Sequence, residues 1–185
     1  FRAIIEKNLK NVQIVAINEL GSLESSLHLV NFDSTHGELK TKLYKSNKGI
    51  KYNNKNIIFC SERDPSKLPW KKLGVDVVLE CSGVFTSKEK SHSHIIAGAK
   101  KVIISAPAKD VDATIVQGVN NNILNKKHNI ISNGSCTTNC LAPVAMVLDK
   151  VLGIEAGFMT TVHSFTGDQR TLDQTHSDLR RARTA

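Results

Sequence analysis

Short runs rich in valine and isoleucine alternate with helical patterns along most of this chain. The runs at 12–17, 75–81 and 101–105 are separated by apolar residues at helical spacing in 22–31 and 87–98. Such alternation favours a parallel sheet that is covered by helices on both faces. We therefore predict an α/β fold, in which ligands bind at the carboxyl ends of the strands.

The pattern changes between residues 39 and 59, where short alternating runs are separated by the polar turns Ser-Asn-Lys-Gly and Asn-Asn-Lys-Asn. This predicts an antiparallel meander. Further short strands are expected at 113–116, 129–132 and 158–162. Residues 1–10 have the pattern of the end of a helix.

The composition is that of a globular chain. Of its 185 residues, 40% are hydrophobic and 23% are charged, and no run approaches the ~20 apolar residues of a membrane span. The formal net charge of +8 attracts phosphate groups. Only 180–183 forms a tight basic cluster, and 5% aromatic residues offer little stacking surface, so nucleic acid is not expected as the primary partner.

The four cysteines form no Cys-x-x-Cys pair, so we expect neither a zinc site nor any other metal site. Cys60 and Cys81 lie in apolar runs and are predicted to be small core residues. Free thiols and the lack of a secretory signal indicate the reducing cytoplasm.

Small polar residues follow several of the predicted strands, at 18–19, 82–83, 105–107 and 132–135. Glu19 is placed to hydrogen-bond the ribose hydroxyls of a dinucleotide, although a solvated loop glutamate fits the pattern equally well. No G-x-G-x-x-G segment is present, so the loop that would hold the phosphates is expected upstream of residue 1.

The segment Ser-Asn-Gly-Ser-Cys-Thr-Thr-Asn-Cys carries the best candidate nucleophile. Cys136 follows a strand and is expected near a helix N-terminus, where the helix dipole lowers the pKa of a thiol. Cys140 is predicted to be its buried neighbour, and Pro143 to distort or delay the first turn. The alternative is two core cysteines in a helix. The expected buried stripe of this helix is Leu141, Val144, Ala145, Leu148 and Val151.

A thiol nucleophile needs a base, and His163 is the best placed histidine, at the end of the strand expected at 158–162. His92 and His94 lie two residues apart on a charged helix and cannot share a face. A cysteine–histidine pair alone fits a hydrolase as well as a dehydrogenase.

The cysteine segment, followed by His163 in Thr-Val-His-Ser-Phe-Thr-Gly-Asp-Gln, resembles the glyceraldehyde-3-phosphate dehydrogenase family. The resemblance covers essentially the whole chain. Its further segments are 15–20, 32–37, 62–65, 80–85, 102–108 and 179–183.

The resemblance implies an incomplete Rossmann-type NAD-binding domain at 1–134, without its first strand and glycine loop. It places the start of an α+β catalytic domain at 135–185, and it implies a homotetramer for the full-length enzyme. A chain with both ends missing is expected to bind NAD poorly and to turn over little by itself.

By the same resemblance, a carboxylate at Glu19 would repel a 2′-phosphate, so NAD is favoured over NADP. The cofactor-binding residues that it implies are Glu19, Arg63 and Ser105. The residues that it implies for the substrate and its phosphates are Ser135, Thr137, Thr166 and Arg181.

The implied reaction converts glyceraldehyde 3-phosphate, NAD and inorganic phosphate to 1,3-bisphosphoglycerate and NADH. Cys136 would form a thiohemiacetal and then a thioester, with His163 as the base. Departures from the family pattern are Gly134, Phe165 and Gly167. Glu19-Leu20 also occurs in the related erythrose-4-phosphate dehydrogenases, which are the alternative, whereas Thr166 argues for the three-carbon substrate.

Overall fold

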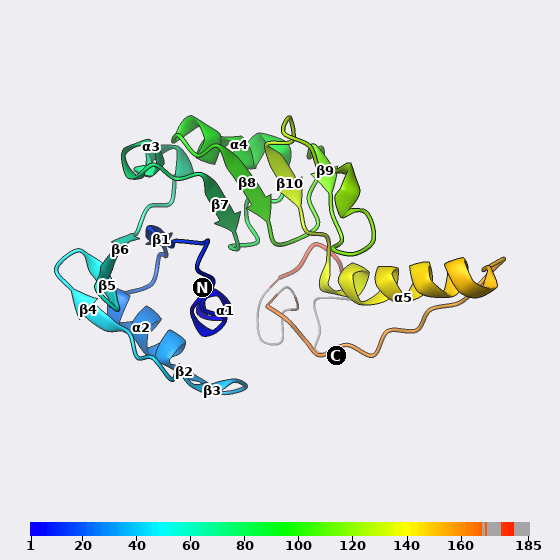
Figure 1. Cartoon of the computed structure of the whole chain (residues 1–185), viewed down its shortest axis with the longest axis horizontal. Helices are drawn as coiled ribbons and strands as arrows, with labels where there is room; N and C mark the ends of the chain where they lie inside the picture. Colours follow the sequence, from blue (N-terminus) through cyan, green and yellow to red (C-terminus); the bar gives the residue numbers. More distant parts are fainter. Residues whose placement is uncertain (168, 170–174, 180–185) are drawn as a thin grey trace. The chain divides into compact units, whose positions relative to one another are not determined.

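The chain consists of two units, Phe1–Asn139 and Cys140–Ala185. The computed structural model describes residues 1–167, 169 and 175–179. The first unit contains two four-stranded sheets with their helices, and the second contains most of one long helix (Figure 1).

The first sheet has the order β1-β6-β5-β4. Its strands are β1 (Ala16–Asn18), β4 (Tyr44–Ser46), β5 (Gly49–Tyr52) and β6 (Lys55–Cys60). Strands β4, β5 and β6 pair antiparallel, which confirms the predicted meander, while β6 also pairs parallel with β1. Gly49 is required at its turn, because an added Cβ would lie 2.4 Å from the Ile57 carbonyl oxygen.

Two helices and a hairpin accompany this sheet. They are α1 (Arg2–Glu6), α2 (Leu23–Asn31), and β2 (Phe32–Asp33) paired with β3 (Gly37–Glu38). The Ser22 hydroxyl accepts the Ser25 backbone N–H at 3.1 Å and caps α2, so the predicted helix at 22–31 is confirmed. The buried core of this region is Ile5, Leu27, Leu39, Leu43, Ile50 and Ile57.

The residues at 39–43 do not form the first strand of the predicted meander, which begins instead at Tyr44. The Asn31 side chain forms hydrogen bonds with both backbone polar groups of Leu43, which a neighbouring strand would otherwise pair with. Its Oδ1 accepts the Leu43 N–H at 2.9 Å, and its Nδ2 donates to the Leu43 carbonyl at 3.0 Å.

The second sheet has the order β7-β8-β10-β9 and is parallel throughout. Its strands are β7 (Val77–Glu80), β8 (Lys101–Ile104), β9 (Ala113–Thr114) and β10 (Ile130–Ser132). Its helices are α3 (Trp70–Leu73), α4 (Lys88–Ile96), and the 3-10 turns η1 (Pro65–Lys67) and η2 (Asn121–Ile123). The alternating strands and helix that were predicted for 75–132 are confirmed.

Helix α4 lies along one face of this sheet (Figure 1), over a core that includes Trp70, Val102, Ile104 and Ile130. The expectation of helices on both faces is wrong for the described residues. The side chains of β7 alternate between a buried face and an exposed face, so its second face is not covered. Val78 is buried, whereas Val77 and Leu79 are 45% and 52% exposed. Cys81 is also exposed rather than a core residue, while Cys60 is half-buried.

Strands β1 and β7 are edges of separate sheets, since no ladder among the described residues joins them. A polar tie connects the first sheet to the segment that leads to the second. The Asn18 amide donates to the Glu62 carbonyl and accepts the Glu62 N–H, both at 2.9 Å. The strand expected upstream of residue 1 stays a prediction.

Helix α5 (Cys136–Leu152) begins in the first unit and continues into the second. It contains Pro143 in its interior, and the proline does not delay its start at Cys136. The stripe that was expected to be buried is exposed, with Val144 55% and Val151 71% accessible. A stripe is buried only by a packed partner, and the described residues from 153 onward contain neither helix nor strand.

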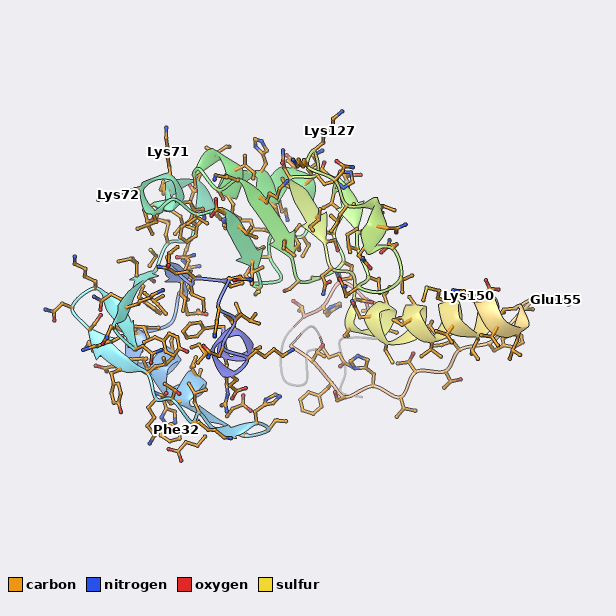
Figure 2. All side chains as sticks on the ribbon, in the orientation of Figure 1. Phe32, Lys71, Lys72, Lys127, Lys150 and Glu155 are labelled. Carbon is orange, nitrogen blue, oxygen red and sulfur yellow. The ribbon has the colours of Figure 1, made fainter. Side chains whose placement is uncertain are left out.

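The strand expected at 158–162 is therefore absent, and Phe158 and Val162 are fully exposed. No helix within the described part of the chain is both long and apolar enough to cross a membrane. Among the basic side chains, Lys71 and Lys72 project from α3, and Lys127 projects from the loop before β10 (Figure 2). These lysines are dispersed, as the sequence predicted.

Candidate active site

The carboxyl ends of β7, β8 and β10 meet at one edge of the second sheet, as expected for parallel neighbours. Backbone hydrogen bonds link the residues that follow them. The Ser105 N–H donates to the Glu80 carbonyl at 3.0 Å, and the Asn133 N–H donates to the Ile104 carbonyl at 2.9 Å. Ser105 is exposed here, so its hydroxyl is accessible at the edge where α/β sheets bind ligands.

The predicted cofactor residues Glu19 and Arg63 lie on either side of the Asn18–Glu62 tie and are both exposed. The Glu19 carboxylate accepts the Gly21 N–H at 3.1 Å, and the Glu19 N–H donates to the Cys60 carbonyl at 3.0 Å. These bonds hold the loop but leave the carboxylate accessible. The structure thus brings Glu19 and Arg63, which are 44 positions apart, to adjoining loops at the end of β1.

The connection from β10 to α5 is held by a buried hydroxyl. Ser132 is completely buried, and its Oγ donates to the Ala106 carbonyl at 2.7 Å and accepts the Gly134 N–H at 3.0 Å. Gly134 has φ of +69°, a left-handed conformation that glycine adopts without strain. The turn is therefore sharp and well fixed immediately before the candidate nucleophile.

Ser135 is the N-cap of α5, and Cys136 is its first helical residue. The Ser135 hydroxyl accepts the Thr138 N–H at 2.9 Å and lies 2.7 Å from the Thr138 hydroxyl. The Asn139 amide donates to the carbonyls of Asn133 at 2.6 Å and Ser135 at 2.9 Å. The prediction that Cys136 starts a helix is confirmed.

This position suits a thiolate, because the unpaired amides and the dipole at a helix N-terminus stabilise negative charge. Cys136 is exposed and can reach a substrate, and Thr137 beside it is half-buried. Cys140 is also exposed, so the prediction that it is a buried neighbour is wrong in this structure. The reason is that no described segment packs against the apolar stripe next to it.

The predicted base lies in the second unit. His163 is exposed, and its Nδ1 is 2.6 Å from the Ser164 carbonyl oxygen, so Nδ1 is the donor in this hydrogen bond. The Thr166 N–H donates to the Gln169 side chain at 3.0 Å. Because Cys136 and His163 belong to different units, their pairing stays a prediction, and Arg181 lies outside the described residues.

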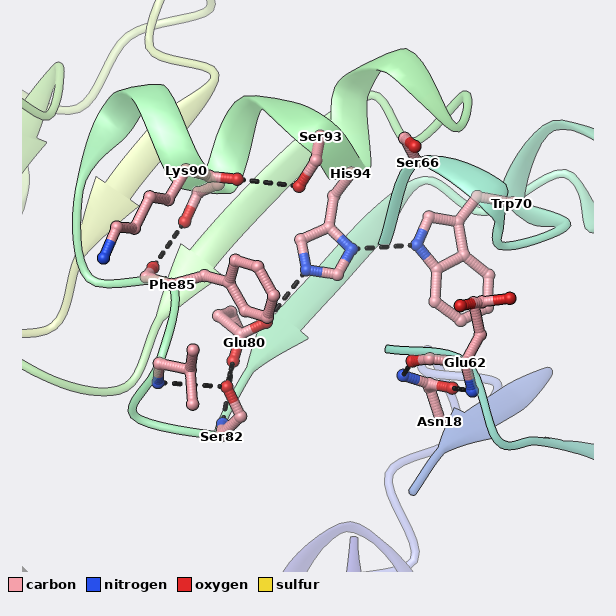
Figure 3. A network of polar contacts seen from close by, with 12 residues as sticks. Asn18, Glu62, Ser66, Trp70, Glu80, Ser82, Phe85, Lys90, Ser93 and His94 are labelled. Atoms are coloured by element: carbon pink, nitrogen blue, oxygen red, sulfur yellow. Dashed lines mark hydrogen bonds and ion pairs between the residues drawn. The ribbon is translucent and has the colours of Figure 1, made fainter. Parts of the chain in front are cut away.

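One polar cluster beneath the site was missed by the sequence analysis. Glu80, His94 and Trp70 are 7%, 4% and 5% exposed and are hydrogen-bonded to one another (Figure 3). The only signal in the sequence is the three-residue spacing of Ser91, His94 and Ala97, which the structure shows to be the buried face of α4. The lysines on either side of this face give the helix a charged, solvent-facing pattern in the sequence.

The first unit is thus a Rossmann-like α/β domain whose strand ends lead into a helix with a cysteine at its N-terminus. Comparison with known families extends this description. Residues 1–88 match the model of the glyceraldehyde 3-phosphate dehydrogenase NAD-binding domain, and residues 135–185 match that of its C-terminal domain.

The chain belongs to the glyceraldehyde-3-phosphate dehydrogenase family. It is 55% identical to the glyceraldehyde-3-phosphate dehydrogenase of Zymomonas mobilis over 185 residues, which is all of this chain and 55% of the relative. It is 51% identical to that of Xanthobacter flavus over 184 residues, again 55% of the relative. The chain therefore spans about half the length of these curated relatives.

Proposed function

We propose that this chain forms part of an NAD-dependent phosphorylating dehydrogenase that oxidises glyceraldehyde 3-phosphate. The observation that supports this most is Cys136 as the first residue of the capped helix α5, directly after the carboxyl end of β10. Family membership adds the substrate class. Within this proposal, residues 1–134 form the NAD-binding domain and residues 135–185 begin the catalytic domain.

The cofactor is NAD, held by Glu19, Arg63 and Ser105. The exposed Glu19 carboxylate at the end of β1 fits the ribose hydroxyls of NAD and disfavours a 2′-phosphate. Bound there, NAD supplies the hydride acceptor for the oxidation. Ser135, Thr137, Thr166 and Arg181 are proposed to hold the substrate and phosphate oxygens, for which hydroxyl and guanidinium donors are suited.

The chemistry of the chain's own residues has two stages. In the first, the Cys136 thiolate attacks the aldehyde carbon and forms a thiohemiacetal, while His163 takes the proton of its hydroxyl as the carbon is oxidised to a thioester. In the second, inorganic phosphate attacks the thioester carbonyl. The C–S bond breaks, 1,3-bisphosphoglycerate leaves, and the thiolate of Cys136 is regenerated.

The assembly and location follow the family. We propose a homotetramer in the cytoplasm for the full-length enzyme. Nucleic acid is not proposed as the primary partner, because the basic residues of the described chain are dispersed and partly paired, for example Lys88 with Asp112 and Lys100 with Asp76.

The test is NADH formation by the full-length protein with glyceraldehyde 3-phosphate and phosphate. C136S should reduce turnover by at least about 1,000-fold, as removal of a catalytic nucleophile does. C140S is the matched control and should retain most of the activity. Unchanged turnover in C136S contradicts the proposed role, and NAD-independent ester cleavage as the main activity favours a cysteine hydrolase. Faster turnover of erythrose 4-phosphate identifies the related four-carbon enzyme.

A further inference from the structure

A buried chain of hydrogen bonds runs from α3 through α4 to the end of β7 (Figure 3). Trp70 Nε1 lies 3.1 Å from His94 Nδ1, and His94 Nε2 lies 2.8 Å from Glu80 Oε2. The other carboxylate oxygen of Glu80 accepts the Ser82 N–H at 2.8 Å and the Ser82 hydroxyl. These hydrogen bonds connect α3, α4 and β7 to the turn at Ser82.

The direction of each bond follows from the donors available. The indole N–H of Trp70 can only donate, so His94 Nδ1 accepts, and the ring proton lies on Nε2 and points at Glu80. Glu80 accepts every bond it makes here. Burial raises the pKa of Glu80, but the bonds from His94 and Ser82 outweigh it and lower the pKa overall. The carboxylate is therefore charged, and both of its oxygens accept hydrogen bonds.

Above this buried carboxylate lies an exposed turn. Ser82, Gly83 and Val84 are all exposed, and Gly83 has φ of +74° with no atom within 4 Å of the position of a Cβ. The Ser82 hydroxyl accepts the Val84 N–H at 3.2 Å. The buried Glu80 carboxylate thus fixes the backbone of an exposed turn.

Helix α4 holds the far side of the same loop. Ser91 is fully buried, and its hydroxyl donates to the Phe85 carbonyl at 2.7 Å. The Phe85 ring packs edge-on against His94 with centroids 6.1 Å apart. The inner face of α4 therefore anchors the turn at both ends, through Glu80 and through Phe85.

We propose that Trp70, His94 and Glu80 are positioning residues of the cofactor site, which fix the Ser82–Gly83 turn as a rigid surface for the dinucleotide. This rests on the proposed function, because the turn follows β7 at the edge where NAD is proposed to bind. The Ser105 N–H, bonded to the Glu80 carbonyl, makes the turn continuous with a proposed cofactor residue. The three residues act through the turn and do not themselves touch the cofactor.

The donor pattern provides a specific test in the full-length protein. In E80Q, the amide oxygen can still accept from Ser82, but the amide N–H₂ meets the Nε2 proton of His94. If the ring proton moves to Nδ1, it faces the Trp70 N–H, so that two donors again oppose each other. The double variant W70F/E80Q removes this second conflict and allows the shifted ring.

We expect E80Q to raise the Kd for NAD by about tenfold, with kcat at saturating NAD changed less than about threefold. W70F/E80Q should recover most of the affinity. The ¹⁵N NMR shifts of the His94 ring should report a proton on Nε2 in the wild type and on Nδ1 in the double variant. If E80Q does not fold, W70F alone should raise the Kd by about threefold and populate both ring forms.

I130V is the matched control, because Ile130 is 1% exposed in the same core and takes no part in the hydrogen-bonded chain. It should lower the unfolding midpoint and leave the Kd for NAD unchanged. Folded E80Q and W70F with a Kd within twofold of the wild type overturn the positioning role but not the proposed function. Wild-type protein that binds no NAD overturns both.

Discussion

Asp112 joins the start of α4 to the start of β10. Its replacement by asparagine should lower the free energy of unfolding by an amount that depends on pH. Its Oδ1 lies 2.6 Å from Lys88 Nζ, and its Oδ2 accepts the backbone N–H groups of Asn129 at 2.7 Å and Ile130 at 2.9 Å. The ion pair with Lys88, followed by these backbone donors, lowers the pKa of Asp112 from 3.8 to about 2. Asparagine cannot accept at all three positions.

The pKa gives the size of the effect. At about 1.4 kcal/mol per pKa unit, the lowering sets a ceiling of about 2.5 kcal/mol on the contribution of this carboxylate to the free energy of unfolding. The Lys88 side chain is 50% exposed, so solvent screens the pair and we expect about 1–2 kcal/mol for D112N at pH 7. The folded pKa lies below the unfolded one, so this stability is complete above about pH 5 and is lost toward pH 2.

Urea unfolding of the wild type and D112N between pH 7 and pH 3 measures the difference directly. About half of the difference should disappear by pH 3, where the unfolded carboxyl is largely protonated. D76N is the control, because the Asp76–Lys100 pair has a similar 2.6 Å distance but both side chains are more than 70% exposed. It should leave the free energy of unfolding nearly unchanged, because solvent screens an exposed pair. A D112N difference that is equal at pH 7 and pH 3 would refute the electrostatic explanation.

Two further predictions concern the site. E19A should weaken NAD binding and reduce the preference for NAD over NADP, because it removes the exposed carboxylate at the end of β1. Titration with both cofactors measures this preference. An unchanged ratio of the two Kd values contradicts the role of Glu19. S135A should lower the free energy of unfolding by about 1 kcal/mol through loss of the α5 N-cap, whereas S135D should keep the cap. The added charge in S135D should slow alkylation of Cys136 at pH 7, and a rate equal to the wild type would exclude an electrostatic effect of position 135 on the thiol.

Local patterns predicted the elements whose causes are local. Helix α2 has a capping serine and an apolar face, and its bounds match the prediction at 22–31. The polar turns between β4, β5 and β6 also carried their own signal. Each of these features depends on residues within one or two turns of one another, so no knowledge of distant partners was needed.

Features that depend on distant partners could not be predicted in the same way. The residues at 158–162 alternate as a strand does, but a strand is stable only when it pairs, and no described segment pairs with them. The apolar stripe of α5 is a true helical pattern, yet its burial requires a second surface. Likewise, nothing local in Lys55–Cys60 indicated that β6 would pair parallel with β1 as well as antiparallel with β5.

The candidate site shows the same division between local and distant causes. The position of Cys136 at a helix start was predictable, because the Gly134 turn, the Ser135 cap and the apolar helix pattern lie within a few residues. The contact between Glu80 and His94 was not, because it depends on how α4 lies on the sheet. A buried histidine on a charged helix resembles a surface residue until its neighbours on the same face are known.

Polar side chains that are buried or half-buried lie under three of the strand ends that contribute to the proposed site, those of β1, β7 and β10. Each of these side chains hydrogen-bonds the backbone of a segment that follows a strand: Asn18 that of Glu62, Glu80 that of Ser82, and Ser132 those of Ala106 and Gly134. Removal of such an anchor leaves a buried donor or acceptor unpaired, which costs about 1–3 kcal/mol and loosens the loop above it. Variants at these anchors should therefore impair ligand binding at temperatures where the domain is still folded. The anchors are Asn18 under Glu19, Glu80 under Ser82, and Ser132 under Gly134.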